Sequence, residues 1–175
     1  MIKISVCDDD EGQLTFFKQC FMEYNEKHKE KIEANFYQSV QSLLNEKKFS
    51  PDVYFLDIEL QDGNGLKLAG KIRTRNSKIP IVFITSHEEF MPEAFHVHAY
   101  QYLNEKKNAQ AVENVLNQLA DYFSEQNQIF SFQTYGEMIS LDCRDIICFT
   151  SEKRKNIVIA ESGEFEYYGK FSDIM

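Results

Sequence analysis

The chain has 175 residues and a formal net charge of −9 at pH 7. Its content of 43% hydrophobic and 27% charged residues is ordinary for a folded domain, which argues against disorder. The acidic balance excludes a general attraction to DNA or to anionic membranes, so nucleic-acid binding has to be argued from local basic segments. No apolar run approaches the length of a membrane span, and the chain starts directly with a predicted strand. We therefore expect a cytoplasmic protein with no membrane contact.

The spacing of cysteine and histidine does not indicate a metal site. The sequence contains four cysteines without CxxC spacing, namely Cys7, Cys20, Cys143 and Cys148. We expect reduced, buried thiols rather than a zinc site or disulfides. The histidines are scattered as well. His96 and His98 could share a strand face, but histidines that are exposed or satisfied in the core are the favoured interpretation.

Residues 1–124 alternate between predicted strands and helices. Each strand is a short apolar run, and each helix shows apolar side chains at helical spacing. Strands are predicted over 2–6, 32–37, 53–56, 81–84 and 100–103, and helices over about 14–24, 40–44, 66–72, 88–95 and 109–123. Ser39 is expected to cap the second helix. Such alternation is typical of a doubly wound parallel sheet in an α/β fold, and we expect this first domain to span residues 1–124.

The periodicity changes after a polar linker, which is predicted at 125–128. Short strands separated by turns follow at 129–132, 138–141, 146–149, 156–159 and 165–168. This pattern is typical of β-hairpins. The segment 129–175 is too short to close a sandwich or a barrel, so we expect a partial all-β domain that is truncated at Met175.

Carboxylates follow two of the predicted parallel strands. Asp57 ends the apolar run of the third strand, and Asp8 and Asp9 follow the first. The carboxyl ends of parallel strands face one rim, where open α/β sheets bind ligands. Carboxylates brought together repel one another, and a hard cation such as Mg²⁺ would neutralise them. Two simpler interpretations stay open: Asp57 could merely end its strand, and acids at a helix start could cap it and interact with its dipole.

Five short motifs occur in the order and at the spacing of one known family. They are Cys7-Asp8-Asp9-Asp10, Phe55-Leu56-Asp57-Ile58-Glu59, Asn64-Gly65, Ile84-Thr85-Ser86 and Ala99-Tyr100-Gln101-Tyr102-Leu103. With these motifs, residues 1–124 resemble the receiver domain of two-component response regulators. The resemblance implies a flavodoxin-like, doubly wound sheet of five parallel strands.

The resemblance also implies a phosphorylation site that depends on Mg²⁺. Asp57 is expected to be the phosphoacceptor and a metal ligand. Asp9 would bind the metal directly and Asp8 through water, and the backbone carbonyl of Glu59 would supply a further ligand. A carboxylate held beside such a cation can attack a phosphoryl group and form an aspartyl phosphate.

Two further positions match the family's conformational switch, and one position departs from the family pattern. Thr85 would contact a phosphoryl oxygen and, with Tyr102, couple phosphorylation to the face formed by the fourth helix, fifth strand and fifth helix. Tyr102 could equally be an ordinary aromatic residue of a strand. Where the family usually has a lysine, this chain has Glu105, which would repel a phosphoryl oxygen. Lys106 is the candidate to replace that lysine.

The implied function is a signalling switch, not an enzyme. A sensor histidine kinase would phosphorylate Asp57, and the chain would form a homodimer through the switch face. An alternative is a pseudo-receiver that dimerises or docks a partner without phosphorylation, as Glu105 suggests. A phosphohydrolase is the weaker third interpretation, because no aspartate stands two residues after Asp57 to act as acid or base.

The second segment resembles the start of a LytTR-type DNA-binding domain, on the motifs at 145–149 and 165–169. Together with the receiver it suggests a regulator of the accessory gene regulator type. A basic turn is expected to contact DNA through Lys153, Arg154, Lys155 and Asn156. A solvated basic turn is the alternative. We expect DNA binding only from a complete C-terminal domain.

Overall fold

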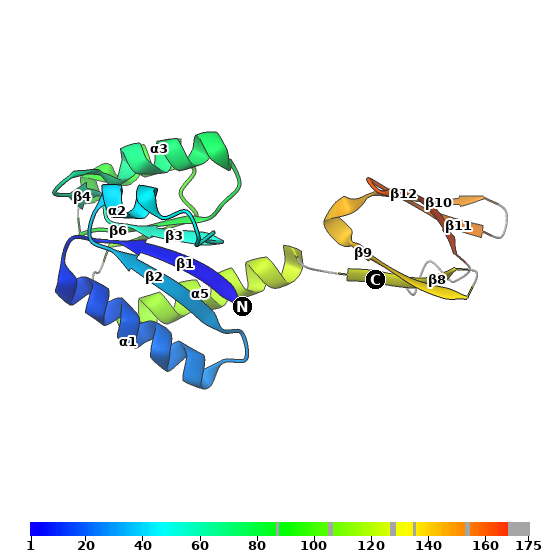
Figure 1. Cartoon of the computed structure of the whole chain (residues 1–175), viewed down its shortest axis with the longest axis horizontal. Helices are drawn as coiled ribbons and strands as arrows, with labels where there is room; N and C mark the ends of the chain where they lie inside the picture. Colours follow the sequence, from blue (N-terminus) through cyan, green and yellow to red (C-terminus); the bar gives the residue numbers. More distant parts are fainter. Residues whose placement is uncertain (87, 105–106, 127–128, 135, 153–154, 168–175) are drawn as a thin grey trace. The chain divides into compact units, whose positions relative to one another are not determined.

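A computed structural model describes residues 1–86, 88–104, 107–126, 129–134, 136–152 and 155–167 (Figure 1). The chain divides into two compact units, Met1–Gln118 and Leu119–Met175. Helix α5 (Ala109–Gln126) continues beyond the predicted end of the first domain, so the first two residues of the predicted linker are helical. The predicted domain boundaries stay a prediction.

The first unit is built on a parallel sheet of five strands in the order β2-β1-β3-β6-β7. The strands are β1 (Ile2–Cys7), β2 (Ile32–Tyr37), β3 (Val53–Leu56), β6 (Ile81–Ile84) and β7 (Gln101–Leu103). The doubly wound α/β fold predicted from the alternating pattern is therefore confirmed. Every residue of β6 is buried, as expected for a strand covered on both faces.

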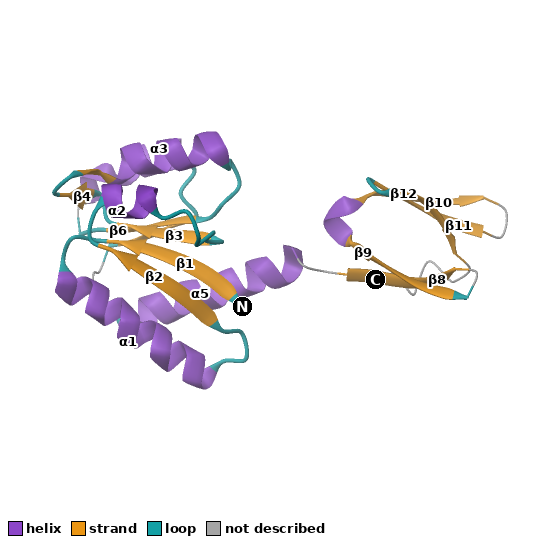
Figure 2. Ribbon diagram, in the orientation of Figure 1, coloured by secondary structure: helices purple, strands orange, loops and turns teal. Residues whose placement is uncertain are grey.

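Helices cover both faces of this sheet (Figure 2). They are α1 (Glu11–Lys27), α2 (Val40–Asn45), α3 (Gly65–Arg75), α4 (Met91–His96), which follows a 3₁₀ turn at Glu88–Phe90, and α5. On one face, Phe17 and Phe21 of α1 each lie 5.9 Å from the ring of Phe55 on β3. On the other face, α2, α3 and α4 pack on one core cluster with Leu56 and Phe83.

Each of the first three helices starts at a side chain that accepts backbone N–H groups. Asp10 accepts from Gly12 and Gln13, Ser39 accepts from Ser42, and Asn64 accepts from Leu66 and Lys67. These caps satisfy N–H groups that have no partner within the helix. The predicted cap at Ser39 is confirmed. Asp10 alone caps α1, so capping does not account for Asp8 and Asp9.

Arg73, on α3, fixes the turn between α4 and β7. Its guanidinium donates hydrogen bonds to the carbonyls of Val97 (2.8 Å), His98 (2.8 Å) and Ile79. His98 adopts a positive φ of 52° in this turn, and His96 ends α4. The expectation that these two histidines could share a strand face is therefore wrong, because the chain is still turning where a strand was considered.

All four cysteines are free, but only two of them are buried. Cys7 lies in β1 and Cys20 in α1, and both belong to the core. Cys143 and Cys148 are exposed, so the expectation of buried thiols is wrong for the second unit. Cys143 lies in a 3₁₀ turn (Cys143–Asp145) and Cys148 lies on the strand that follows it.

The second unit contains a two-stranded hairpin and a three-stranded antiparallel sheet. The hairpin is β8 (Ile129–Thr134) with β9 (Glu137–Asp142), and the sheet is β10 (Ile146–Glu152), β11 (Lys155–Ala160) and β12 (Gly163–Tyr167). Phe132, Val158 and Tyr167 form its buried core. The predicted all-β segment is therefore present.

None of the helices within the described residues is long and apolar enough to cross a membrane.

Candidate functional site

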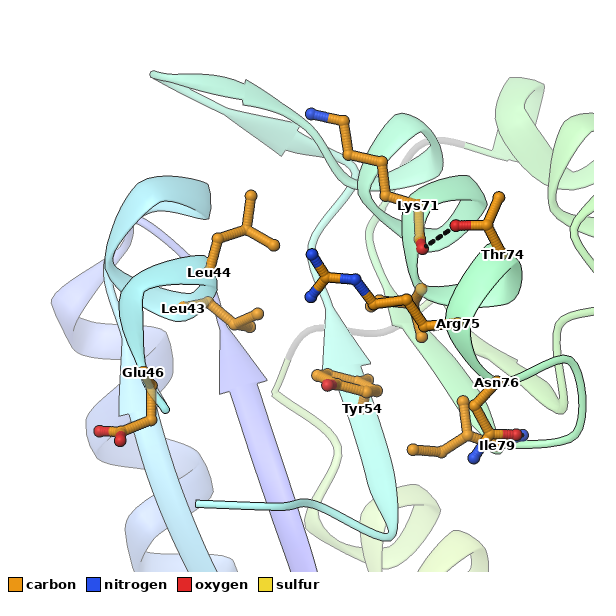
Figure 3. Close-up of a pocket in the computed structure, with 10 residues that line it drawn as sticks. Leu43, Leu44, Glu46, Tyr54, Lys71, Thr74, Arg75, Asn76 and Ile79 are labelled. Atoms are coloured by element: carbon orange, nitrogen blue, oxygen red, sulfur yellow. Dashed lines mark hydrogen bonds between the residues drawn. The ribbon is translucent and has the colours of Figure 1, made fainter. Parts of the chain in front are cut away.

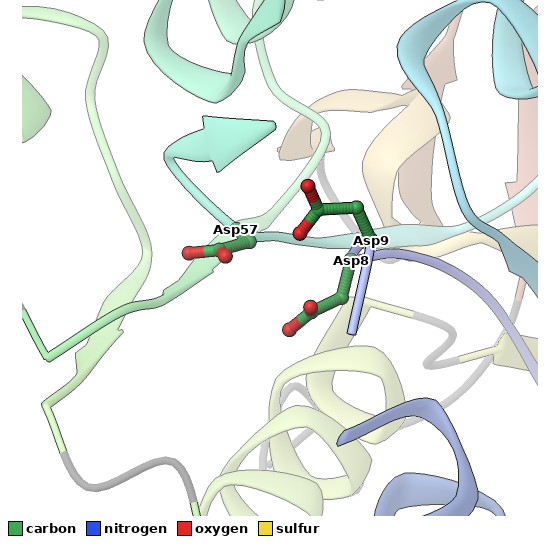
Figure 4. Close-up of side chains that lie close together, drawn as sticks. All are labelled: Asp8, Asp9 and Asp57. Carbon is green, nitrogen blue, oxygen red and sulfur yellow. The ribbon is translucent and has the colours of Figure 1, made fainter. Parts of the chain in front are cut away.

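Three carboxylates meet at the carboxyl edge of the central strands (Figure 4). Asp8 and Asp9 follow β1, and Asp57 follows β3, its neighbour in the sheet. The backbone N–H of Asp57 donates to the carbonyl of Cys7 at 2.8 Å, which brings the two strand ends into register. One carboxylate oxygen from each of the three residues lies within 4.8 Å of the others. The sequence therefore predicted a real cluster.

Each carboxylate is oriented by a backbone N–H group close to it. Asp57 Oδ1 accepts from Ile58 N at 2.8 Å, and Asp8 Oδ1 accepts from Asp10 N at 2.9 Å. Asp9 Oδ2 accepts from Gln61 N at 3.0 Å. Asp8 and Asp57 are buried, with exposed fractions of 0% and 2%, while Asp9 is half-buried. The cluster is therefore held rigidly and largely out of solvent.

The electrostatics of this edge favour a cation. The pKa of the neighbouring Cys7 thiol is raised to about 12, first by burial and then by Asp62, Asp8, Asp57 and Asp9. Three close carboxylates repel one another, and burial strengthens that repulsion. A set of oxygen donors of this kind suits Mg²⁺. The residues present therefore fit a hard divalent ion.

Gly65 allows α3 to start directly against this edge. Its N–H donates to the carbonyl of Ile58 at 2.9 Å. A Cβ atom at this position would lie 2.0 Å from the carbonyl oxygen of Asp57 and 3.0 Å from the Cα of Ile58. Only glycine fits such a close backbone approach. The sequence motif Asn64-Gly65 marked this position, and the structure supplies the reason.

Thr85 follows β6, the neighbour of β3, and Tyr102 lies on β7, the neighbour of β6. Thr85 is fully buried, and its N–H donates to the carbonyl of Leu103 at 3.0 Å. Tyr102 lies opposite Phe83 on β7 and packs, half-buried, against the core cluster. Thr85 thus ends at the same sheet edge as the acids. The predicted roles of both residues as a switch pair stay predictions.

Of the remaining predicted site residues, some lie in described strands and others lie outside the described residues. Glu59 begins a small hairpin of β4 (Glu59–Leu60) and β5 (Gly63–Asn64), and the role of its carbonyl stays a prediction. Glu105, Lys106, Lys153 and Arg154 lie outside the described residues.

The observed strand begins one residue before the predicted strand at 156–159, so it includes both Lys155 and Asn156 of the expected basic turn. They are the first two residues of β11. Lys155 Nζ lies 2.7 Å from Glu166 Oε2, and Asn156 is buried opposite Tyr167. These cross-strand contacts extend the ladder into the expected loop, and contact of Lys155 or Asn156 with DNA stays a prediction.

Sequence reasoning missed Asp62, which holds the start of α2. Its carboxylate accepts from Val40 N at 2.9 Å and from Gln41 N at 3.0 Å. These bonds lower the pKa of Asp62 below its ordinary value of 3.8. The preceding residue, Gln61, contacts Asp9, so one short turn joins the acid cluster to α2. An acid in a turn was visible in the sequence, but nothing indicated its partner on a distant helix.

Asp62→Asn should lower stability in a way that depends on pH. A carboxylate whose pKa is lower in the folded state than in the unfolded state stabilises the fold at pH values above the unfolded-state pKa. This stabilisation is lost as the pH falls through the folded-state pKa. The variant should therefore have a lower urea midpoint than the parent at pH 7, and the difference should shrink below pH 3.8. Glu33→Gln, which removes an exposed acid from β2, is the control. An equal difference at both pH values would contradict this assignment.

Comparison with known proteins identifies the family of this chain. The family model described as the response regulator receiver domain matches residues 4–117. The chain belongs to the response regulator receiver domain family. A response regulatory protein of Yersinia pestis is 29% identical over 120 residues, which cover 69% of this chain and 49% of the relative. The sensory transduction protein LytR of Staphylococcus haemolyticus is 32% identical over 111 residues, which cover 63% of this chain and 42% of the relative. The chain thus matches less than half of each relative's length.

Solved receiver structures share the fold. The response regulatory domain of mrkE from Klebsiella pneumoniae has a TM-score of 0.60 and 24% identity, covering 71% of this chain and 100% of that one. TrrA from Thermotoga maritima, described as a complex with Mg(2+)-BeF, has a TM-score of 0.58 and 22% identity, covering 68% of this chain and 99% of that one. At these identities the likeness concerns the fold of the receiver domain.

Proposed function

We propose that this chain carries the receiver of a two-component response regulator, in which a sensor histidine kinase phosphorylates Asp57 in the presence of Mg²⁺. The observation that carries the proposal is the cluster of Asp8, Asp9 and Asp57, whose oxygens lie within 4.8 Å of one another at the edge where α/β sheets bind ligands. Membership of the receiver family supports the same function.

Phosphoryl transfer would place Asp57 as the nucleophile. A carboxylate oxygen of Asp57 attacks the phosphorus of a phosphohistidine, the P–N bond breaks, and the imidazole leaves with its electron pair. Asp8, Asp9, Asp57 and the carbonyl of Glu59 would hold Mg²⁺, which when bound offsets the negative charge of the carboxylates and of the incoming phosphoryl group. The bond from Ile58 N to Asp57 Oδ1 orients the nucleophile.

Thr85 and a lysine would complete the site. Thr85, buried at the end of β6, would donate its hydroxyl to a phosphoryl oxygen and transmit the change to Tyr102. Lys106 would take the role of the lysine that Glu105 replaces. The function of the receiver would then depend on this substitute cation.

The output would be control of transcription by a homodimer. The names of the LytR relatives support transcription control, and the β-strands of 129–167 are consistent with the first part of a LytTR-type domain. DNA binding, with Lys153, Arg154, Lys155 and Asn156 as candidate contacts, would require a complete C-terminal domain. Dimerisation through the α4-β7-α5 face is supported by an apolar hollow of about 300 Å³ between α4 and β7. Phe95 lies at this hollow with 74% of its surface exposed.

Intact-mass spectrometry tests the proposal directly. Incubation with Mg²⁺ and acetyl phosphate should add a single phosphoryl group to the parent chain and none to Asp57→Asn, because the amide cannot attack phosphorus. Replacement of the exposed Asp121 on α5 by asparagine should leave the adduct unchanged. The adduct should also disappear when EDTA removes the metal.

The opposite results identify the alternatives. A persistent adduct on Asp57→Asn would overturn the assignment of the phosphoacceptor. No adduct on a folded parent chain would favour a pseudo-receiver that works without phosphorylation. In that case Glu105→Lys is the first variant to make. Sustained phosphate release from small phosphoesters would instead indicate a phosphohydrolase.

A further inference from the structure

A cavity of about 390 Å³ opens between α2 and α3, over the start of β3 (Figure 3). It exists because the two helices differ in length: α2 has 6 residues and ends at Asn45, whereas α3 has 11 and continues to Arg75. The sheet beyond the end of α2 is therefore incompletely covered. Accordingly, Tyr54 is half-buried, while the other residues of β3 are fully buried.

The lining of this cavity is divided about equally between apolar and polar surface, and the apolar part comes from both helices. Leu43 and Leu44 line it from α2, and Ile72 and Ile79 line it from α3 and the segment that follows. The ring of Tyr54 forms the floor between them (Figure 3). Such a surface would favour contact with an apolar body of matching size.

Two cations line the α3 side of the cavity, Lys71 and Arg75. The Arg75 side chain extends from α3 toward α2 in Figure 3. Burial and Tyr37 raise the pKa of Tyr54, and Arg75 acts in the opposite direction, so the guanidinium is close enough to influence the phenol. Glu46 also lines the cavity, but its carboxylate points away from Arg75 in Figure 3.

The two arginines of the last turn of α3 have different roles. Arg73 donates to three backbone carbonyls and serves the fold. Within the described part of the chain, neither Arg75 nor Lys71 forms an ion pair with a carboxylate. A guanidinium next to apolar walls is suited to bind a carboxylate with two parallel hydrogen bonds. The chain has a net charge of −9, so the positive charge of Lys71 and Arg75 on this side of the cavity is a local exception.

We propose that this cavity binds a small organic carboxylate with an apolar aryl or acyl body. The apolar body would lie on Tyr54 between the leucines and isoleucines, and the carboxylate would pair with Arg75. The volume of about 390 Å³ is within the range of small-molecule sites. This site requires neither Mg²⁺ nor a phosphoryl group, so it stands independently of the function proposed above.

Methyl NMR of the full chain tests this site with 4-phenylbutyrate as the probe, in the absence of Mg²⁺. Saturable shifts are expected for the methyl groups of Leu43, Leu44, Ile72 and Ile79. The uncharged amide of the same probe should bind about tenfold more weakly, because it cannot form the charged pair. Arg75→Gln should weaken the carboxylate by a similar factor. Lys78→Gln removes an equal charge next to the cavity without lining it and should have no effect.

Two results would overturn the proposal. The first is the absence of saturable shifts at the cavity up to about 10 mM probe. This concentration is about tenfold above a dissociation constant of about 1 mM, which is the weakest binding that would count as specific here. The second is equal binding of the acid and the amide, or equal binding by the parent and a folded Arg75→Gln. Thermal melting of each variant establishes that it is folded, which is expected because both side chains are exposed.

Discussion

Gly65→Ala is expected to destabilise the receiver by about 3 kcal/mol or more, as measured by urea unfolding. The added Cβ would lie 2.0 Å from the carbonyl oxygen of Asp57 and 2.9 Å from its carbonyl carbon. Both contacts are with backbone, so no side-chain rotation can relieve them. Either the start of α3 or the strand end that carries Asp57 must move, and Mg²⁺ binding should weaken with it.

Gly70→Ala is the matched control within the same helix. A Cβ atom at Gly70 would have no neighbour within 4 Å. Alanine loses less conformational freedom than glycine when the helix folds, so the free energy of unfolding of this variant should be about 0.5–1 kcal/mol higher than that of the parent. If Gly65→Ala were as stable as the parent, the strand end would be able to relax, and the rigidity ascribed to the acid cluster would be wrong.

Asp8→Asn is expected to have opposite effects with and without Mg²⁺. In EDTA the variant should be more stable than the parent by about 2 kcal/mol, because it removes one of three repelling carboxylates from a buried position. The asparagine keeps the size of the side chain and an oxygen that can accept from Asp10 N. At saturating Mg²⁺ the free energy of unfolding of the parent should increase by about 3 kcal/mol, since the ion binds only the folded state. The free energy of unfolding of the variant should increase much less.

Urea midpoints measured in EDTA and at several Mg²⁺ concentrations give both the stability difference without the metal and the stabilisation by Mg²⁺. Glu59→Gln is the control, because it keeps the backbone carbonyl that is assigned to the metal and changes only an exposed side chain. Its response to Mg²⁺ should match that of the parent. A parent chain whose midpoint does not respond to Mg²⁺ would contradict the assignment of the cluster as a metal site.

The sequence was sufficient to predict the sheet and the acid cluster, because both depend on local patterns. Buried strands such as β6 are continuous apolar runs, and the ends of parallel strands necessarily share one edge. Asp8, Asp9 and Asp57 were therefore brought together by topology alone. Thr85, which follows β6, lies at the same edge for the same reason, and the motif residue Gly65 lies against it.

Features that depend on contacts between distant segments were not predictable. The bond from Asp62 to α2 joins residues 22 positions apart, and Arg73 reaches carbonyls up to 25 positions away. Both are single polar side chains with no periodic signature. The cavity over Tyr54 follows from the difference in length between α2 and α3, and helix ends are difficult to place from sequence. The spacing of His96 and His98 also fits a strand, because residues in a turn can show the same alternation.

The turn at Gln61 and Asp62 also sets a limit on the length of this part of the chain. Gln61 is bonded to Asp9, and Asp62 is bonded to the first two residues of α2. One additional residue between β4 and β5 would displace at least one of these partners. By contrast, no helix or strand occupies residues 46–52, where Lys48 N donates to the Glu46 side chain and Asp52 is hydrogen-bonded to Lys3 of β1. Insertions, labels and peptide tags therefore belong between Lys48 and Asp52, and the hairpin after Asp57 has to keep its natural length.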